Sequence, residues 1–193
     1  MKKMTSEQYR RKLAGAHARE AGLTFEEQIA ASLEWYEERG IMKAAKTPEP
    51  MKPIGKRQKG GRFLAIFTEK AQVDFSGTLV GGRAVRFEAK QTDTDRFDRS
   101  RLTKKQMDDL RGHEKLGAAC FVLLCFSSDR FYRVPWVLWD KMKESFGRQY
   151  VTEEDLQGLQ VSCVAGIIKI LEGTIIGSES AWYSVSWKSK TNF

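Results

Sequence analysis

The chain has 193 residues, of which 41% are hydrophobic and 11% aromatic, so it can bury a core and is not composed like a disordered protein. No apolar run reaches the roughly 18–20 residues that cross a bilayer, and no apolar stretch follows the N-terminal lysines, so we expect neither a membrane span nor a signal peptide. The net charge of +8, from 33 Lys and Arg against 25 Asp and Glu, favours a polyanionic partner such as nucleic acid.

Three cysteines are present without a CxxC pair, which argues against a structural zinc site. Cys120 and Cys125 stand inside the apolar run 118–126, where a free cysteine behaves as a small buried hydrophobe. Such cysteines are typical of a reducing compartment, so we expect a cytoplasmic protein.

The N-terminal part of the chain predicts two helices. Residues 5–20 read as a polar, basic helix within the basic N-terminal segment 1–21. A better-marked helix begins at Thr24, which forms a capping box with Glu27, and it ends at a natural stop, Gly40.

Residues 47–62 are rich in Pro, Gly and basic residues, and this composition predicts a basic loop or protruding stalk. A second basic stretch covers residues 96–105. Basic clusters on separate segments indicate an extended surface for DNA phosphates. The candidate DNA-binding residues are Lys52, Lys56, Arg57, Lys59, Arg62, Arg99, Arg101, Lys104 and Lys105.

Strands are expected in the middle of the chain. Residues 63–67 form a short apolar run, residues 72–77 alternate, and residues 83–90 alternate cleanly after a glycine-rich turn. In the last of these strands, Glu88 and Lys90 are two positions apart, so they share a face.

The second half of the chain predicts further helices and strands. A helix capped by Thr103 runs to about residue 116, and the unbroken apolar run 118–126 is typical of a strand buried on both faces. The remaining expected elements are a strand over 131–134, a short helix that buries Trp136 and Trp139, a short helix capped by Thr152 and a strand over 166–172. We therefore expect a single α/β domain over 1–193, with a mixed central sheet flanked by helices and an unassigned C-terminal tail over 173–193.

Asp74, Glu88 and Lys90 are the candidate catalytic residues. The glycine-rich turn favours an antiparallel hairpin that brings Asp74 alongside Glu88, while Val73 and Phe75 point to the opposite face. Two converging carboxylates favour a hard cation such as Mg²⁺, and a lysine beside them can position water or stabilise charge on phosphorane oxygens. The alternative is an ordinary ion-pair stripe on an edge strand.

The stretch VDFSGTLVGGRAVRFEAKQT, residues 73–92, resembles the active-site region of the RecU family of Holliday junction resolvases. These belong to the PD-(D/E)xK, or restriction-endonuclease-like, nucleases. The similarity runs from about Gly22 to Glu172 and is strongest over 73–126. It implies a restriction-endonuclease-like core and a homodimer that nicks four-way DNA junctions symmetrically with Mg²⁺, for which Mn²⁺ can substitute, in recombination or repair. The small size and short arm suit a phage or prophage member.

Carried over by position, the resemblance assigns Asp74 and Glu88 as metal ligands, together with the backbone carbonyl of Ala89. It assigns Lys90 as the catalytic lysine. The segment 47–62 corresponds to the stalk of the family, where a basic arm can contact several duplexes of a junction by shape rather than by sequence.

Two further residues match the family pattern. Glu26 corresponds to an acid on the N-terminal helix, although an acid at this position can also simply favour the helix N-terminus. Gln106 corresponds to a glutamine that supports the metal site or a phosphate, and an ordinary polar helix residue is the alternative. The chain departs from the family at Lys105, where a histidine is expected, at Gln72 and Val73, where hydroxyl residues are expected, and at Gln91, where an acid is expected.

Two alternatives to a junction resolvase stay open. One is a restriction- or repair-type endonuclease of the same fold that cuts linear duplexes. The other is a non-catalytic junction-binding recombination protein, which the clustered carboxylates disfavour because a binder has no need of them near DNA phosphates.

Overall fold

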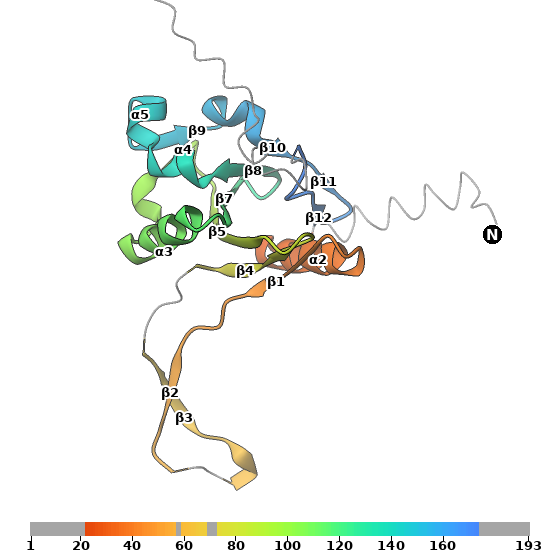
Figure 1. The fold of residues 1–193 in the computed structure, drawn as a ribbon, viewed down its shortest axis with the longest axis vertical. Helices are drawn as coiled ribbons and strands as arrows, with labels where there is room; N and C mark the ends of the chain where they lie inside the picture. The colour runs from red at the N-terminus through yellow and green to blue at the C-terminus, as the bar shows by residue number, and fades with distance from the viewer. Residues whose placement is uncertain (1–21, 57–58, 69–72, 174–193) are drawn as a thin grey trace, which may run out of the picture.

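The computed structural model describes residues 22–56, 59–68 and 73–173 (Figure 1). The expected features outside these residues are the helix over 5–20, Arg57, Gln72 and the tail after residue 173. The elements, in chain order, are α2 (Phe25–Glu38), β1 (Met42–Lys46), β2 (Met51–Ile54), η1 (Lys59–Gly61), β3 (Leu64–Phe67), β4 (Phe75–Leu79), β5 (Ala84–Thr92), β6 (Arg96–Asp98), η2 (Arg99–Arg101), α3 (Lys104–Lys115), β7 (Ala119–Phe126), β8 (Arg130–Pro135), α4 (Trp136–Asp140), α5 (Met142–Phe146), β9 (Tyr150–Thr152), η3 (Glu154–Leu159), β10 (Gln160–Val161), β11 (Cys163–Val164) and β12 (Ile167–Ile168). Within the described part of the chain, no helix has the length and apolar character that a bilayer span requires.

The centre of the fold is a mixed sheet of six strands in the order β1-β4-β5-β7-β8-β10. Among its described strands, only β5 and β7 run parallel, and the other neighbours pair antiparallel. Helix α2 covers one face through Ile29, Leu33 and Tyr36, whereas α3 and α4 cover the other face through Leu110 and Trp136. This is the α/β architecture that the sequence predicts, with helices on both faces of a mixed sheet.

Strand β7 lies in the middle of the sheet, and all eight of its residues are buried, as its unbroken apolar run predicts. An aromatic column crosses the neighbouring strands. Phe87 of β5 stacks on Phe75 of β4 and on Phe121 of β7, with ring centroids 4.7 and 4.8 Å apart. Cross-strand aromatic pairs of this kind stabilise a sheet, so the column fixes the strands that carry the candidate catalytic residues.

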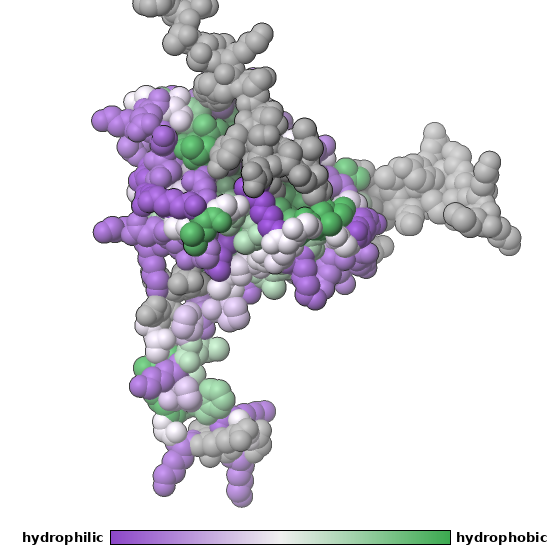
Figure 2. Space-filling model, in the orientation of Figure 1, coloured by the Kyte–Doolittle hydropathy of each residue, from purple (hydrophilic) through white to green (hydrophobic). Residues whose placement is uncertain are grey.

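An arm projects from the body between β1 and β4 (Figure 1). Its strands β2 and β3 pair antiparallel, with Ile54 opposite Leu64. The strand expected over 63–67 therefore exists, but it belongs to the arm, where Leu64 is 62% exposed. Figure 2 shows apolar and hydrophilic side chains mixed along the arm, in agreement with the stalk predicted from the Pro-, Gly- and Lys-rich composition.

Strand β1 has no counterpart among the expected elements. Its sequence, MKAAK, lacks the large alternating apolar residues that mark a strand, and only Met42 at its start is buried. It forms at the edge of the sheet by pairing with β4. Tertiary pairing rather than local propensity therefore makes this strand.

The C-terminal part corrects two expectations. The short helix expected after Thr152 is present as η3, but Thr152 ends β9 and does not cap it; its hydroxyl donates to Asp155 Oδ2 at 3.0 Å. The strand expected over 166–172 is limited to Ile167–Ile168. After β12, the chain is held against α2, because the N–H of Leu171 donates to the buried hydroxyl of Tyr36 at 3.0 Å.

Ser32→Ala is expected to lower the free energy of unfolding by about 1–3 kcal/mol. The buried Ser32 hydroxyl on α2 accepts a hydrogen bond from the N–H of Ile168 at 2.8 Å, so alanine leaves a buried donor without its acceptor. Urea titration measures the loss. Ser100→Ala, at an exposed position, is the control and should stay within about 0.5 kcal/mol of the unaltered chain. Equal values for both variants would contradict the anchoring role of Ser32.

Candidate active site

The candidate catalytic residues meet at the end of the β4–β5 hairpin. Strands β4 and β5 pair with Phe75 opposite Phe87, so Asp74, one residue before β4, lies beside Glu88. The N–H of Asp74 donates to Glu88 Oε2, and the N–H of Ala89 donates to Asp74 Oδ2, both at 3.1 Å. The antiparallel hairpin is the one predicted, and it brings the two carboxylates together.

The chain bends at Asp74, contrary to simple strand alternation. Val73 packs with the side chains on the α3 face of the sheet, whereas Phe75 packs with those on the α2 face. The expectation that Val73 and Phe75 share one face is therefore wrong. At the bend, the carboxylate of Asp74 accepts from the N–H of Ala89 just beyond the last paired position of the β4–β5 ladder.

Glu88 is a buried carboxylate with opposing charges around it. Its side chain is fully buried, Lys90 Nζ donates to its Oε1, and the same ammonium lies 3.9 Å from Asp74 Oδ2. Burial raises the pKa of Glu88 to about 7, the charge of Asp74 adds to the rise, and Lys90 opposes it. The ionised form is thus costly at neutral pH, and a cation bound beside it would stabilise it.

Gln106 links this carboxylate to the start of α3. Its Oε1 accepts from the N–H and the hydroxyl of Thr103, which completes a capping box at the helix N-terminus. Its Nε2 donates to Glu88 Oε1 at 2.5 Å. One side chain therefore fixes both the first turn of α3 and the orientation of Glu88.

Glu26, in the first turn of α2, lies on the α2 face of the sheet, opposite the face that carries α3 and Gln106. It borders a cavity of about 140 Å³ that Asp74 and Ala89 also line. Glu26 Oε1 accepts from Lys46 Nζ at 2.5 Å, and Lys46 lines the same cavity. Lys46 is a member of the site that the sequence does not reveal, because it ends a strand without a strand pattern and no spacing relates it to the hairpin.

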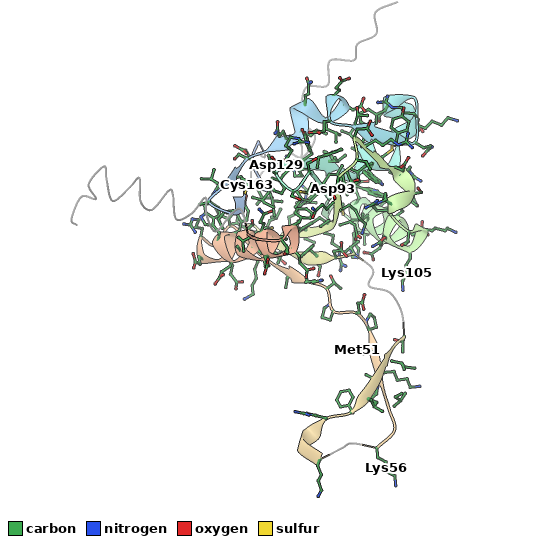
Figure 3. The ribbon with its side chains drawn as sticks, turned by 180° about the vertical axis from the view of Figure 1, so that it is seen from behind. Met51, Lys56, Asp93, Lys105, Asp129 and Cys163 are labelled. Atoms are coloured by element: carbon green, nitrogen blue, oxygen red, sulfur yellow. The ribbon has the colours of Figure 1, made fainter. Side chains whose placement is uncertain are left out.

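The basic residues expected to bind DNA fall into two groups. Those exposed on the arm and at the start of α3 are Lys52, Lys56, Lys59, Arg62, Lys104 and Lys105. Figure 3 shows Lys56 near the far end of the arm and Lys105 on the side of the body from which the arm leaves. Arg99 and Arg101 are instead partly engaged within the protein. Arg99 donates to Asp140 at 3.1 Å, and Arg101 donates to the carbonyl of Gln91 at 2.9 Å.

The donor set at the site is small. In the parts of the chain that the structure describes, no three Asp, Glu, His or Cys side chains form a group that could hold a metal ion by themselves. A Mg²⁺ site does not need such a group, because this ion keeps several waters and binds proteins through one or two carboxylates. Asp74 and Glu88, with the carbonyl of Ala89, are the residues that could hold it.

The fold and the site together define a class of protein. An α/β core that places two carboxylates and a lysine at the end of an antiparallel hairpin, with α3 and the buried strand β7 following, agrees with the core that the sequence resemblance implies. The family model for RecU, recombination protein U, matches residues 20–172, and the chain belongs to this family.

Individual relatives agree with the family. The chain is 27% identical over 148 residues to the Holliday junction resolvase RecU of Geobacillus kaustophilus, covering 70% of this chain and 72% of that protein. It is 26% identical over 143 residues to the protein of the same name from Bacillus pumilus, covering 70% and 69%. Among solved structures, it is similar to Hjc, a Holliday junction resolvase from Archaeoglobus fulgidus, with a TM-score of 0.39 and 14% identity over 65% of this chain and 85% of that one.

Proposed function

We propose that this chain is a Holliday junction resolvase, an endonuclease that nicks four-way DNA junctions by Mg²⁺-dependent phosphodiester hydrolysis in recombination or repair. The observation that carries the proposal is the convergence of Asp74, Glu88 and Lys90 in a chain of the RecU family. The names of its relatives and the net charge of +8 support a DNA substrate.

The residues present fit a magnesium ion. Asp74, Glu88 and the carbonyl of Ala89 would hold it, and the raised pKa of Glu88 supports a site whose negative charge a cation neutralises. When bound, Mg²⁺ polarises a phosphodiester and lowers the pKa of water. Mn²⁺ is expected to substitute, because it takes the same oxygen ligands.

The side chains around the two carboxylates prepare the reaction. The ammonium of Lys90 contacts Glu88 and lies 3.9 Å from Asp74, where it can orient a water nucleophile and stabilise charge on the phosphorane oxygens. Gln106 holds Glu88 in one orientation through its hydrogen bond. Glu26, paired with Lys46 at the rim of the cavity, adds a third carboxylate near the site.

A four-way junction as substrate predicts the number of subunits and the role of the arm. Resolution of a junction needs two nicks in opposing strands, so we expect a homodimer with one site in each subunit. The exposed lysines and Arg62 of the arm would contact phosphates of several duplexes and thereby select the branched shape.

The assay for this function compares an end-labelled four-way junction with a duplex of equal length and sequence. With Mg²⁺, we expect paired nicks in opposing strands of the junction, and with EDTA we expect none. Preferential cutting of the duplex would favour a restriction- or repair-type endonuclease instead. Tight junction binding without any cutting would favour a non-catalytic junction-binding protein.

Gln106→Met is expected to raise the pKa of Glu88 further, because the buried carboxylate loses a hydrogen-bond donor. The acid limb of the Mg²⁺-dependent nicking rate should therefore move to higher pH, which a pH–rate profile measures. Thr103→Ala is the control, since it also breaks the capping box, at a cost of about 0.5–2 kcal/mol in stability, but leaves the donor to Glu88 in place. A profile that moves equally in both variants would contradict a direct action of Gln106 on Glu88.

A further inference from the structure

Two arginines share one aromatic ring on the short ribbon formed by β6 and β9. The guanidinium carbon of Arg96 lies 4.9 Å from the ring centroid of Tyr150, and that of Arg148 lies 4.7 Å from the same centroid. Strand pairing holds the ring in place, because Tyr150 pairs with Asp98 across the ribbon. Arg96, Tyr150 and Arg148 are called the Tyr150 platform below.

The two arginines of the platform are engaged differently. Arg148 is anchored, because it donates to Asp155 Oδ2 at 2.6 Å and to the carbonyl of Phe146 at 3.1 Å. Arg96 is 52% exposed, and its guanidinium donates no hydrogen bond to another described residue; its ion pair with Asp98 spans 3.7 Å. A guanidinium stacked on a ring keeps its N–H edge available for an oxyanion, and the oxygens of a phosphate match this edge in shape and charge.

The platform is joined to the candidate active site by the short segment between β5 and β6. Arg101 donates to the carbonyl of Gln91, next to Lys90, and its guanidinium carbon lies 5.9 Å from the ring centroid of Phe97. Phe97 belongs to β6, directly after Arg96. In Figure 2, hydrophilic side chains cover much of the side of the body that carries α3 and α5 in Figure 1. Arg101 therefore links the end of β5 to β6, which carries Arg96.

We propose that the Tyr150 platform binds a backbone phosphate on a duplex arm of the DNA, away from the phosphate that is cut. The inference rests on the proposed function and names an additional binding site for the same substrate. Arg96 makes the phosphate contact, and the ring of Tyr150 holds its guanidinium in position. A contact of this kind fixes the register of the duplex on the protein and carries no sequence information.

The test uses Arg96→Gln in the full chain, with Arg39→Gln as its matched control. Arg39 is also exposed and stacked, 4.0 Å from the ring centroid of Trp35, but it lies at the end of α2. Junction affinity is measured in EDTA at several salt concentrations. Arg96→Gln should raise the Kd about 3- to 10-fold and lower the slope of log K against log salt by about 0.9, the value for one phosphate that the protein no longer neutralises. Equal shifts for both variants would overturn the proposal, because they would reflect net charge alone.

Two further measurements separate this site from catalysis. Tyr150→Leu keeps both charges and removes the stacking surface, so it should weaken junction binding in the same direction as Arg96→Gln. In Arg96→Gln, the nicking rate at low enzyme concentration should fall by about the same factor as the junction affinity, because weaker binding rather than altered chemistry limits the rate. If the unaltered chain neither binds nor nicks junctions, the proposed function and this inference both fail. If the unaltered chain nicks and Arg96→Gln binds as tightly, only the inference fails.

Discussion

Glu88→Gln should reduce nicking of four-way junctions by about 1,000-fold or more, while the Kd for the junction in EDTA stays within about threefold. Glutamine keeps the size of the side chain and can still contact Gln106 and Lys90, but it cannot supply the second carboxylate to a cation. Glu88 is also fully buried, so its loss changes little of the surface that DNA meets. Single-turnover nicking and mobility-shift titration of the same preparation measure both quantities.

The same substitution should stabilise the metal-free fold at alkaline pH. The pKa of Glu88 is raised from 4.5 to about 7, so the folded state binds this proton more tightly than the unfolded state. The resulting stability is complete below about pH 4.5 and is lost as the pH rises through about 7. In EDTA at pH 8, Glu88→Gln should therefore exceed the unaltered chain in unfolding free energy by about 1–3 kcal/mol.

With Mg²⁺ at pH 8, the unaltered chain should have a higher unfolding free energy than Glu88→Gln. The ion should stabilise the unaltered chain more at pH 8 than at pH 5.5, because binding requires the ionised carboxylate, and it should change Glu88→Gln little. Glu34→Gln, at an exposed position on α2, controls for the loss of one negative charge and should behave like the unaltered chain. If Glu88→Gln nicks junctions at the rate of the unaltered chain, Glu88 is not an active-site residue.

The parts of the fold that the sequence predicts correctly are those with a local signature. Thr24 with Glu27 and Thr103 with Gln106 form capping boxes, whose spacing marks the start of a helix regardless of the rest of the chain. The apolar run in β7 is long enough to require burial on both faces. The β4–β5 hairpin follows from two alternating segments around a glycine-rich turn.

The parts that sequence does not predict depend on distant partners. Strand β1 has two alanines and two lysines, and it becomes a strand only because β4 lies beside it. Residues 63–67 have the composition of a core strand, but they pair with β2 in the exposed arm. The bend at Asp74 separates Val73 from Phe75, although strand periodicity places them on one face. For the two strands, tertiary pairing outweighs the local pattern.

The residues of the candidate site also fall into those that the sequence predicts and those that it does not. Glu88 and Lys90 share a strand, and the hairpin adds Asp74, so periodicity and turn chemistry suffice for these three residues. Lys46 reaches the cavity only through the unforeseen strand β1. The Tyr150 platform joins β6 to β9 across more than fifty residues of sequence, and no spacing rule connects them.

Replacing the four described basic residues of the arm by glutamine is expected to weaken junction binding by about 100-fold near 0.1 M salt. The substitutions are Lys52→Gln, Lys56→Gln, Lys59→Gln and Arg62→Gln. Each phosphate that is no longer neutralised should lower the salt slope by about 0.9, so the slope should fall by about 3 to 4. The hairpin itself should persist, because these side chains are exposed and β2 and β3 pair through their backbones.

The control removes the same number of positive charges from exposed positions on the body: Arg39→Gln, Lys115→Gln, Lys141→Gln and Lys143→Gln. The arm projects away from the body (Figure 1). If it selects branched DNA by contacting further duplexes of a junction, the arm variant loses junction affinity far more than duplex affinity. The body variant should lower both affinities alike and by less. Equal losses in the two variants would mean that the net charge of +8, rather than the position of the arm, governs binding, and the shape selectivity would then have to come from the body.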